Sequence, residues 1–228
     1  GKIKEICELK SKFTFRLLVD DAHGFGTLGK TGAGAGEEQG CQDQIDVYFS
    51  TFAKSMAGFG AFIAGDADII RILKYNLRSQ VFAKSLTMPM VIGGLKRLEL
   101  LRSRPEIKAK LWENVNKLQN GLIERGFNIG GTDTCVTPVM MQGSTVEATL
   151  LVKDLRENYG IFTSVVIYPV IPKGMILLRL IPTASHTDAE INETLDAFDA
   201  IHDKLTSGFY KEQEQKLLEE KGLSFKST

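Results

Sequence analysis

A dense run of glycines follows the first apolar segment of the chain and limits the folds that the chain can adopt. Glycine weakens helices and strands, whereas it accepts positive φ angles and close backbone approach more readily than any other residue. The run therefore predicts a long loop with several positive φ angles between two elements of regular structure. Residues 24–40 contain seven glycines: Gly24, Gly26, Gly29, Gly32, Gly34, Gly36 and Gly40.

Short apolar segments flank this loop and have the length of buried strands. Residues 16–20 precede the loop, and residues 47–50 and 60–65 follow it. Continuous apolar runs of this length are typical of buried strands, above all in parallel sheets. These segments alternate with loops and with a helical pattern at residues 2–10. Residues 1–80 therefore predict an α/β fold.

The second half of the chain has a different pattern. A long helical stretch from Pro89 to Arg125 is broken near Pro105, because the residue before a proline is biased away from helix. Beyond the break we expect strands at residues 136–141, 161–166 and 175–180. We therefore expect residues 1–104 to belong to a larger domain, and residues 105–228 to form a smaller α+β domain with a charged, solvated helical tail.

Two helix starts in this second half carry a capping signal. Ser144 with Glu147, and Thr187 with Glu190, have the spacing of a capping box. Gly160 is placed to end the first of these helices in a left-handed conformation. The second helix has an apolar stripe, and we expect it to face the core. That stripe consists of Ile191, Leu195, Phe198, Ile201 and Leu205.

The composition argues against several classes of protein. Lys+Arg and Asp+Glu both number 28, so no net charge attracts the chain to nucleic acid or to anionic lipid. No segment approaches the roughly 20 apolar residues of a membrane span, and we expect no signal peptide. The three cysteines are scattered, which argues against a disulfide framework or a zinc site and predicts a cytoplasmic protein.

Three polar side chains stand at the ends of the predicted strands. Asp20 and His23 follow the first strand, and Lys54 follows the second. In α/β proteins the loops beyond the strand ends are where ligands bind. Pyridoxal phosphate (PLP) needs a lysine to bond its aldehyde, an acid for its ring nitrogen and a hydrogen-bond donor for its ring oxygen. The three residues therefore predict a PLP site.

Other interpretations of these residues have to be weighed. A lysine taken alone is most often a surface cation, but small or hydroxylic neighbours of Lys54 leave room for a ligand. Asp20, Asp21 and His23 are of types that bind metals, yet further ligands at a recognisable spacing are missing. The glycine pattern that begins at Gly24 is too weak to indicate a nucleotide site. We rank PLP above these alternatives.

Arg179 lies within an apolar strand-like run near the end of the chain. An arginine in such a run is unfavourable unless its charge is paired. It could form a structural ion pair, or it could hold a substrate carboxylate through two hydrogen bonds. Spacing alone leaves these two interpretations about even.

Taken in order, these segments resemble the α-oxoamine synthases, PLP enzymes of fold type I. Within that family they are most similar to bacterial serine palmitoyltransferases, with the enzymes that make 2-amino-3-ketobutyrate or 8-amino-7-oxononanoate close behind. Their order and spacing agree along most of the chain, so the set is far more specific than any one motif. The matching segments are Val19-Asp20-Asp21-Ala22-His23-Gly24-Phe25-Gly26, the glycines Gly29, Gly32 and Gly34, Ser50-Thr51-Phe52-Ala53-Lys54-Ser55, and Leu177-Leu178-Arg179-Leu180 before Ala184-Ser185-His186-Thr187.

The resemblance implies a role for each site residue. Lys54 matches the lysine that bonds the cofactor and acts as general base, Asp20 the partner of the ring nitrogen, and His23 the partner of the ring oxygen. Thr51 matches a residue that contacts the phosphate, and Arg179 matches the residue that binds the amino-acid carboxylate. Relatives carry a small polar pair near residues 83–84 that reaches the phosphate in the neighbouring subunit. Alanine at position 83 cannot donate there, so we assign this contact to Lys84.

The resemblance also implies an activity and an assembly. We expect a homodimer with shared active sites that condenses an amino acid, serine first, with an acyl-CoA and releases CO2, as in the synthesis of sphingolipid bases. Three alternatives remain: one of the two related synthases, an aminotransferase of the same fold type, or a non-catalytic subunit that stabilises a partner. Members of the family carry a substantial region before the Asp-x-x-His motif. We therefore expect this chain to match the C-terminal part of such an enzyme.

Overall fold

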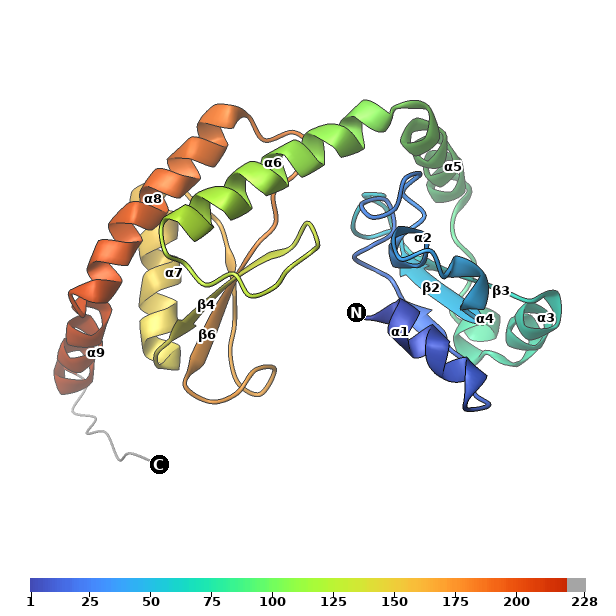
Figure 1. The fold of residues 1–228 in the computed structure, drawn as a ribbon, viewed down its shortest axis with the longest axis horizontal. Helices are drawn as coiled ribbons and strands as arrows, with labels where there is room; N and C mark the ends of the chain where they lie inside the picture. Colours follow the sequence, from blue (N-terminus) through green and yellow to red (C-terminus); the bar gives the residue numbers. More distant parts are fainter. Residues whose placement is uncertain (221–228) are drawn as a thin grey trace. The chain divides into compact units, whose positions relative to one another are not determined.

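The computed structural model describes residues 1–220, which divide into two compact units at residue 109 (Figure 1). The first unit comprises Gly1–Ala109, and the second begins at Lys110. The long helix α6 (Pro105–Glu124) contains the division. The break before Pro105 is present as predicted, because α5 (Met88–Ser103) ends there and α6 begins after Arg104.

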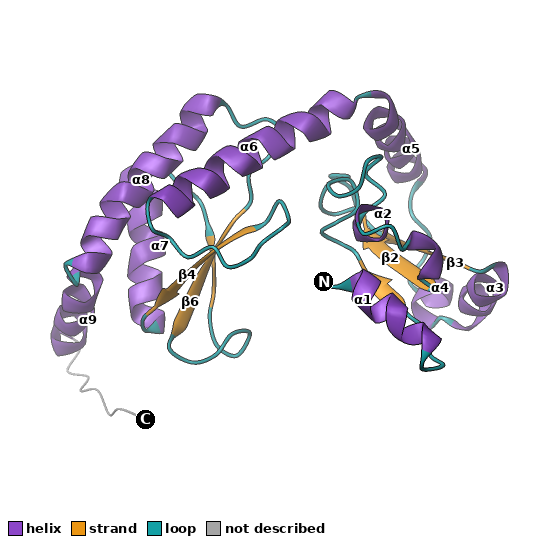
Figure 2. Ribbon diagram, in the orientation of Figure 1, coloured by secondary structure: helices purple, strands orange, loops and turns teal. Residues whose placement is uncertain are grey.

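A three-stranded sheet organises the first unit (Figure 2). The order of the strands is β1-β2-β3, where β1 is Leu18–Asp20, β2 is Val47–Thr51 and β3 is Ala61–Gly65. β1 pairs with β2 in parallel, and β3 pairs with β2 in antiparallel. Because β1 and β2 run in the same direction, both end at the same edge of the sheet. The predicted α/β fold is therefore confirmed.

Burial in this sheet differs from the prediction. Within the described chain Leu18 is 62% exposed, and in β3 only Phe62 and Ile63 are half-buried. Of β2, only Ser50 is fully buried. The expectation of buried strands was wrong for most of these positions, because a continuous apolar run does not reveal which neighbours cover it.

Helices precede, interrupt and follow the strands of this sheet along the chain, and α3 contacts β3. The predicted helix at residues 2–10 is present as α1 and a following 3₁₀ turn, whereas the helices between residues 66 and 83 were not predicted. α5 has no buried residue, and its apolar side chains Met88, Ile92 and Leu95 are exposed. The helical elements of the first unit before α5 are α1 (Ile3–Glu8), η1 (Leu9–Ser11), α2 (Ala35–Glu38), η2 (Gln42–Gln44), α3 (Ala67–Asn76) and α4 (Arg78–Phe82).

The second unit is the α+β arrangement that the sequence predicted. Its antiparallel sheet has the order β4-β6-β5, formed by Thr137–Gln142, Met175–Leu180 and Ser164–Val166. Its helices after α6 are α7 (Thr145–Tyr159), α8 (Asp188–Thr206) and α9 (Phe209–Glu220). None of the helices within residues 1–220 is long and apolar enough to cross a membrane.

Both predicted capping boxes are present. The Ser144 hydroxyl accepts hydrogen bonds from the amides of residues 146 and 147, and the Glu147 carboxylate accepts one from the Ser144 amide. α7 ends at Gly160, whose φ of 69° is left-handed as expected. Thr187 and Glu190 form the same reciprocal pair at the start of α8. These local signals therefore predicted both ends of α7 and the start of α8 correctly.

The core of the second unit lies between its sheet and its helices, and it includes the predicted stripe of α8. The C-terminal helix corrects one expectation. α9 is not simply a solvated tail, because Tyr210 and Glu214 are buried and the Ser144 hydroxyl donates to the Glu214 carboxylate at 2.7 Å. The part of the tail beyond residue 220 lies outside the described residues. Core residues include Leu118, Leu122, Phe127, Val139, Leu151, Leu155, Leu178, Ile191, Leu195, Phe198 and Ile201.

Candidate active site

The parallel pairing of β1 with β2 brings two predicted site segments to one edge of the sheet. Val19 is paired with Tyr48 and Asp20 with Phe49, so the two strands run side by side up to their ends. Asp20 is the last residue of β1, and Lys54 follows the end of β2 by three residues. Asp20, His23 and Lys54 are all exposed at this edge. The fold therefore delivers the acid, the imidazole and the amine to the same side of the unit.

Lys54 stands on a tight turn between β2 and β3. The turn is closed by main-chain bonds from Gly58 to Phe52 and from Ala57 to Lys54. The Thr51 hydroxyl donates to the Gly60 carbonyl at 3.1 Å and accepts from the Ala53 amide at 3.1 Å. Its one hydrogen is therefore already used, and the phosphate contact expected of Thr51 stays a prediction. Within residues 1–220 the Lys54 ammonium has no hydrogen bond or ion pair, so it is free to react.

The turn that carries Asp20 and His23 is fixed to β2. The Asp21 amide donates to the Phe49 carbonyl at 2.8 Å, and the buried Ser50 hydroxyl donates to the Asp21 carbonyl at 3.2 Å. One oxygen of Asp20 accepts from the Ala22 amide at 3.1 Å. No cation among residues 1–220 pairs with the Asp20 carboxylate, which leaves its charge available to a ligand.

Asp21 holds the start of the glycine-rich loop and was not predicted to do so. Its buried carboxylate accepts hydrogen bonds from the Ala35 amide at 2.7 Å and from the Tyr48 hydroxyl at 2.9 Å. Burial and these contacts with Asp21 raise the pKa of Tyr48. A Cβ at Gly34 would lie 2.0 Å from an Asp21 oxygen, and one at Gly24 would lie 2.1 Å from the other. Glycine is required at both positions because the carboxylate approaches the backbone so closely.

Two glutamates of α2 hold the rest of the loop. The Glu37 carboxylate accepts from the amides of Thr31 and Ala33 at 3.0 Å, and Glu38 accepts from the Gly29 amide at 2.7 Å. Burial alone would raise the pKa of Glu37, but the bonds from Ala33 and Thr31 lower it. The amides that could have cradled a phosphate thus donate to the chain's own carboxylates. The positive φ angles expected of the loop are present at Gly26, Gly29, Gly32, Gly34 and Gly40.

Lys84 lies on the turn between α4 and α5 and is exposed. Its φ is +68°, a left-handed conformation that non-glycine residues seldom adopt and that is frequent at functional sites. Two residues later, Leu86 packs so closely on Gly60 that a Cβ there would lie 2.6 Å from the leucine side chain. The turn of Lys84 therefore packs beside the end of the Lys54 turn. Its phosphate contact stays a prediction.

Arg179 belongs to β6 in the second unit and is half-buried. Its Nε donates to the Ser164 hydroxyl of β5 at 3.2 Å. No ion pair within residues 1–220 involves Arg179, so the structural ion pair considered above has no support. A half-buried guanidinium without a carboxylate partner is suited to bind an anionic ligand.

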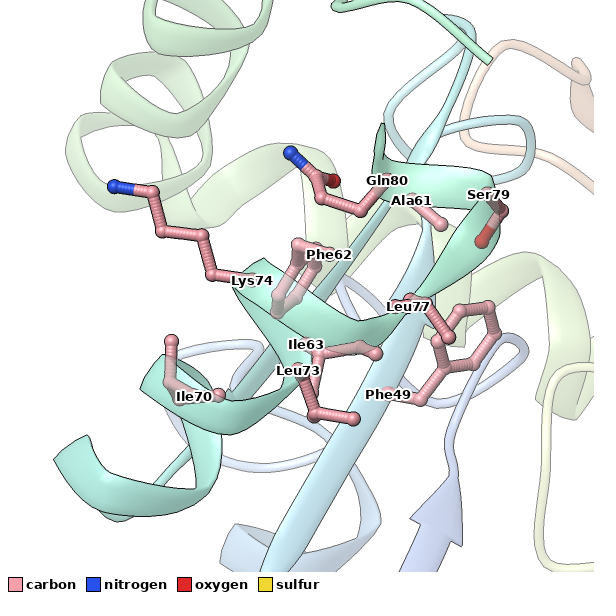
Figure 3. Close-up of a pocket in the computed structure, with 10 residues that line it drawn as sticks. All are labelled: Phe49, Ala61, Phe62, Ile63, Ile70, Leu73, Lys74, Leu77, Ser79 and Gln80. Carbon is pink, nitrogen blue, oxygen red and sulfur yellow. The ribbon is translucent and has the colours of Figure 1, made fainter. Parts of the chain in front are cut away.

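An apolar pocket lies between the sheet of the first unit and the helices α3 and α4. It has a volume of about 450 Å³ and contains none of the predicted site residues (Figure 3). Nor does any group of three or more His, Cys, Asp or Glu side chains within residues 1–220 form a candidate metal site, so the metal alternative gains no support. The pocket is lined by residues of β2, β3, α3 and α4 and the segments beside them: Phe49, Ala61, Phe62, Ile63, Ile70, Leu73, Lys74, Leu77, Ser79 and Gln80.

The sequence of this chain is similar to those of a known protein family. Residues 1–198 match the model of the family described as aminotransferase class I and II. The chain is 65% identical over 222 residues to the cysteate-C-fatty acyltransferase of Capnocytophaga ochracea, a match that covers 97% of this chain and 53% of that protein. It is 36% identical over 194 residues to the serine palmitoyltransferase of Sphingobacterium spiritivorum, with coverage of 85% and 48%.

A solved structure agrees with these relatives. The serine palmitoyltransferase of S. paucimobilis, determined as a variant with bound PLP and myriocin, superposes with a TM-score of 0.82 at 29% identity. The match covers 88% of this chain and 50% of that one. The chain thus spans about half the length of the relatives that it matches. It belongs to the aminotransferase class I and II family with the fold of type I, and its relatives within that family are the α-oxoamine synthases that its motifs predicted.

Proposed function

We propose that the protein is a PLP-dependent acyltransferase that condenses an amino acid with a fatty acyl thioester and releases carbon dioxide and the free thiol. One observation carries the proposal: parallel strands deliver Asp20, His23 and Lys54 to one sheet edge, in a chain that is 65% identical to a cysteate-C-fatty acyltransferase. An aminotransferase of the same fold is less well supported, because the relatives named above are acyltransferases.

The residues at this edge are suited to PLP. Lys54 has an amine without a partner among the described residues, and Asp20 has a carboxylate without a cation there. An anionic carboxylate stabilises a protonated ring nitrogen, and a free amine bonds the aldehyde. A similar solved serine palmitoyltransferase contains PLP. Thr51 and Lys84 remain the proposed contacts of the phosphate, and His23 the proposed contact of the ring oxygen.

The reaction assigns a task to each of these residues. Bound PLP supplies an electron sink for the pair of electrons left when the Cα–H bond breaks. Lys54 would hold the cofactor and, once the amine of the substrate has replaced it there, would take the Cα proton as general base. Asp20 keeps the ring nitrogen protonated, which maintains that sink. Arg179 is proposed to orient the substrate carboxylate.

The amino-acid substrate is better supported as cysteate than as serine, our first expectation. The 65% identity to the Capnocytophaga enzyme is far above the 36% identity to the Sphingobacterium serine palmitoyltransferase. Cysteate carries a sulfonate where serine carries a hydroxyl, so the two substrates differ by one full negative charge. Serine stays the second candidate, followed by the substrates of the two related synthases.

Kinetics with both amino acids test this choice. We expect kcat/KM for cysteate to exceed that for serine by on the order of 100-fold, because serine cannot form the hydrogen bonds to a charged sulfonate, which contribute about 1.5–3 kcal/mol. Release of CO2 from carboxyl-labelled cysteate and serine, with one fatty acyl thioester, measures the ratio, and mass spectrometry identifies the products. A ratio below one would identify serine as the substrate. No CO2 release from either would contradict the acyltransferase proposal.

Replacement of Arg179 tests its proposed carboxylate contact. We expect Arg179→Ala to raise the dissociation constant of the amino acid by on the order of 100-fold, since charge-assisted hydrogen bonds contribute about 1.5–3 kcal/mol. PLP content should stay that of the unaltered protein. Arg125→Ala is the control, because Arg125 is a cation of the same unit paired with Asp199 at the surface. An unchanged dissociation constant in Arg179→Ala would assign the arginine a structural role.

The assembly and location of the protein remain part of the proposal. We propose a homodimer with shared active sites in the cytoplasm, on the basis of the family resemblance. A non-catalytic companion subunit is disfavoured, because companions of that kind lack the lysine that this chain carries as Lys54. PLP content of the purified protein separates an enzyme from such a companion.

A further inference from the structure

A hydrogen bond joins the glycine-rich loop to the Lys54 turn. The Ser55 hydroxyl donates to the Phe25 carbonyl at 2.6 Å, across 30 residues of sequence. Ser55 follows Lys54 directly, and Phe25 lies two residues after His23. The bond therefore connects the segment that presents the amine to the segment that presents the imidazole.

The backbone at this junction is shaped to admit the serine. Gly26 has a φ of +82°, and a Cβ there would lie 2.6 Å from the Ser55 hydroxyl oxygen and 2.7 Å from its Cβ. Such distances are too short for any side chain to be accommodated without movement of Ser55. Glycine is therefore favoured at position 26 both by the left-handed backbone conformation and by the close approach of Ser55.

Aromatic packing supports the same junction. The Phe25 ring of the loop meets the Phe62 ring of β3 edge-on, with centroids 5.1 Å apart. The Phe52 ring of the Lys54 turn stacks on the same Phe62 ring at 5.4 Å. Both segments thus pack on one residue of the sheet, and the Ser55 hydrogen bond joins them directly.

Asp21, directly before the loop, is a second anchor: its main chain is bonded to β2, and its carboxylate accepts from the Ala35 amide and from the Tyr48 hydroxyl. The loop is therefore anchored both beside Asp20 and beside Lys54. Catalytic groups that must act together need supports of this kind, because displacements of about 1 Å lower rates strongly.

We propose that Ser55 is a positioning residue: its hydrogen bond to the Phe25 carbonyl holds the Lys54 turn against the glycine-rich loop and sets the position of the Lys54 amine relative to Asp20 and His23. This inference rests on the proposed function, because that function requires the Lys54 amine to be held in position. Ser55 needs no contact with substrate or cofactor for this role.

Two serine variants of the PLP-loaded protein test the role. We expect Ser55→Ala to weaken PLP binding by about threefold to tenfold, the range of one net hydrogen bond. The pH midpoint of the visible absorbance of bound PLP should shift by about half a unit or more, because a threefold change in an equilibrium constant equals half a pH unit. Ser11→Ala is the matched control: the Ser11 hydroxyl also donates to a main-chain carbonyl, that of Glu8 at 2.8 Å, in an exposed position. It should change neither quantity.

Two glycine variants test the junction from the other side. Gly26→Ala should displace Ser55 and reproduce the effects of Ser55→Ala on PLP affinity and on the pH midpoint. Gly40→Ala is its control, since Gly40 also has a positive φ, +65°, but nothing lies within 4 Å of a Cβ there. Both variants carry backbone strain, so a difference between them isolates the contact with Ser55.

The outcomes separate this inference from the proposed function. If Ser55→Ala matches Ser11→Ala in PLP affinity and in pH midpoint, Ser55 has no positioning role and the inference fails. If the unaltered protein binds no PLP, or if Lys54→Ala keeps its visible absorbance, the proposed function itself fails. Trapping of PLP on Lys54 with borohydride, read by peptide mass spectrometry, distinguishes the two cases without measuring activity.

Discussion

Lys54→Ala is expected to lower kcat by about 10⁴-fold or more, the upper range for loss of a general base, since it also removes the amine that bonds the cofactor. The reason is geometric. Within residues 1–220, Lys54 is the lysine that the parallel strands bring to the same sheet edge as Asp20 and His23. Lys84, whose turn packs beside the Lys54 turn, lies between α4 and α5 and does not directly follow a strand of the sheet, and its proposed contact is with the phosphate. The loss should therefore not be rescued by higher concentrations of PLP.

Absorbance spectra measure this expectation directly. The unaltered protein should show a visible band that Lys54→Ala lacks, and borohydride should attach PLP to the peptide containing residue 54 in the first protein alone. Lys12→Ala is a control, because Lys12 is an exposed lysine of the same unit beyond α1. It should keep both the band and the activity. Identical bands in the unaltered protein and Lys54→Ala would remove the lysine from the proposed site.

Local signals predicted much of this fold because they act over a few residues. Ser144 with Glu147 marked the start of α7, and Gly160 marked its end, since each of these motifs satisfies backbone groups within one turn. The density of glycine predicted positive φ angles in the same way. The edge that carries Asp20 and Lys54 followed from the rule that ligands bind beyond strand ends.

The remaining features depend on contacts between residues far apart in sequence. Asp21 was weighed only as a possible metal ligand, although it holds the loop through Ala35 and Tyr48. In the sequence Ser55 is only a small, hydroxylic neighbour of Lys54, and the folded chain brings it to Phe25. The pattern of residues along the chain does not predict hydrogen bonds between residues that are far apart in sequence.

The cysteines show the same limit of sequence reasoning. Cys7 and Cys41 were treated as scattered, yet both are buried and free, and their thiols are neighbours. Burial first, and then the charge and hydrogen bond of Cys7, raise the pKa of Cys41. A thiol with a raised pKa is less often ionised and therefore less reactive. Cys7 and Cys41, far apart in the sequence, are therefore neighbours in the folded chain.

Asp154→Ala is expected to destabilise the second unit by about 3 kcal/mol, because it leaves a partly buried cation and two polar groups without their acceptor. Asp154 is 9% exposed and joins three helices. Its carboxylate accepts from Lys204 of α8, from the Tyr210 hydroxyl of α9 and from Asn158 of α7, each at 2.6 Å. Urea unfolding followed by circular dichroism measures the loss. The control is Asp199→Ala, which removes a surface pair with Arg125 and should change stability by less than about 1 kcal/mol.

The pKa of the Asp154 carboxylate determines how its contribution to the stability of the second unit depends on pH. Burial alone would raise the pKa of Asp154, but hydrogen bonds from Lys204, Tyr210 and Asn158 together lower it. Because the pKa is lower in the folded than in the unfolded chain, its contribution is complete above the ordinary aspartate value of about 3.9 and is lost as the pH falls below it. The destabilisation caused by Asp154→Ala should therefore be constant from pH 5 to 7 and should shrink below about pH 4. A difference between the two proteins that stays the same down to pH 2 would mean that these hydrogen bonds do not depend on the charge of Asp154.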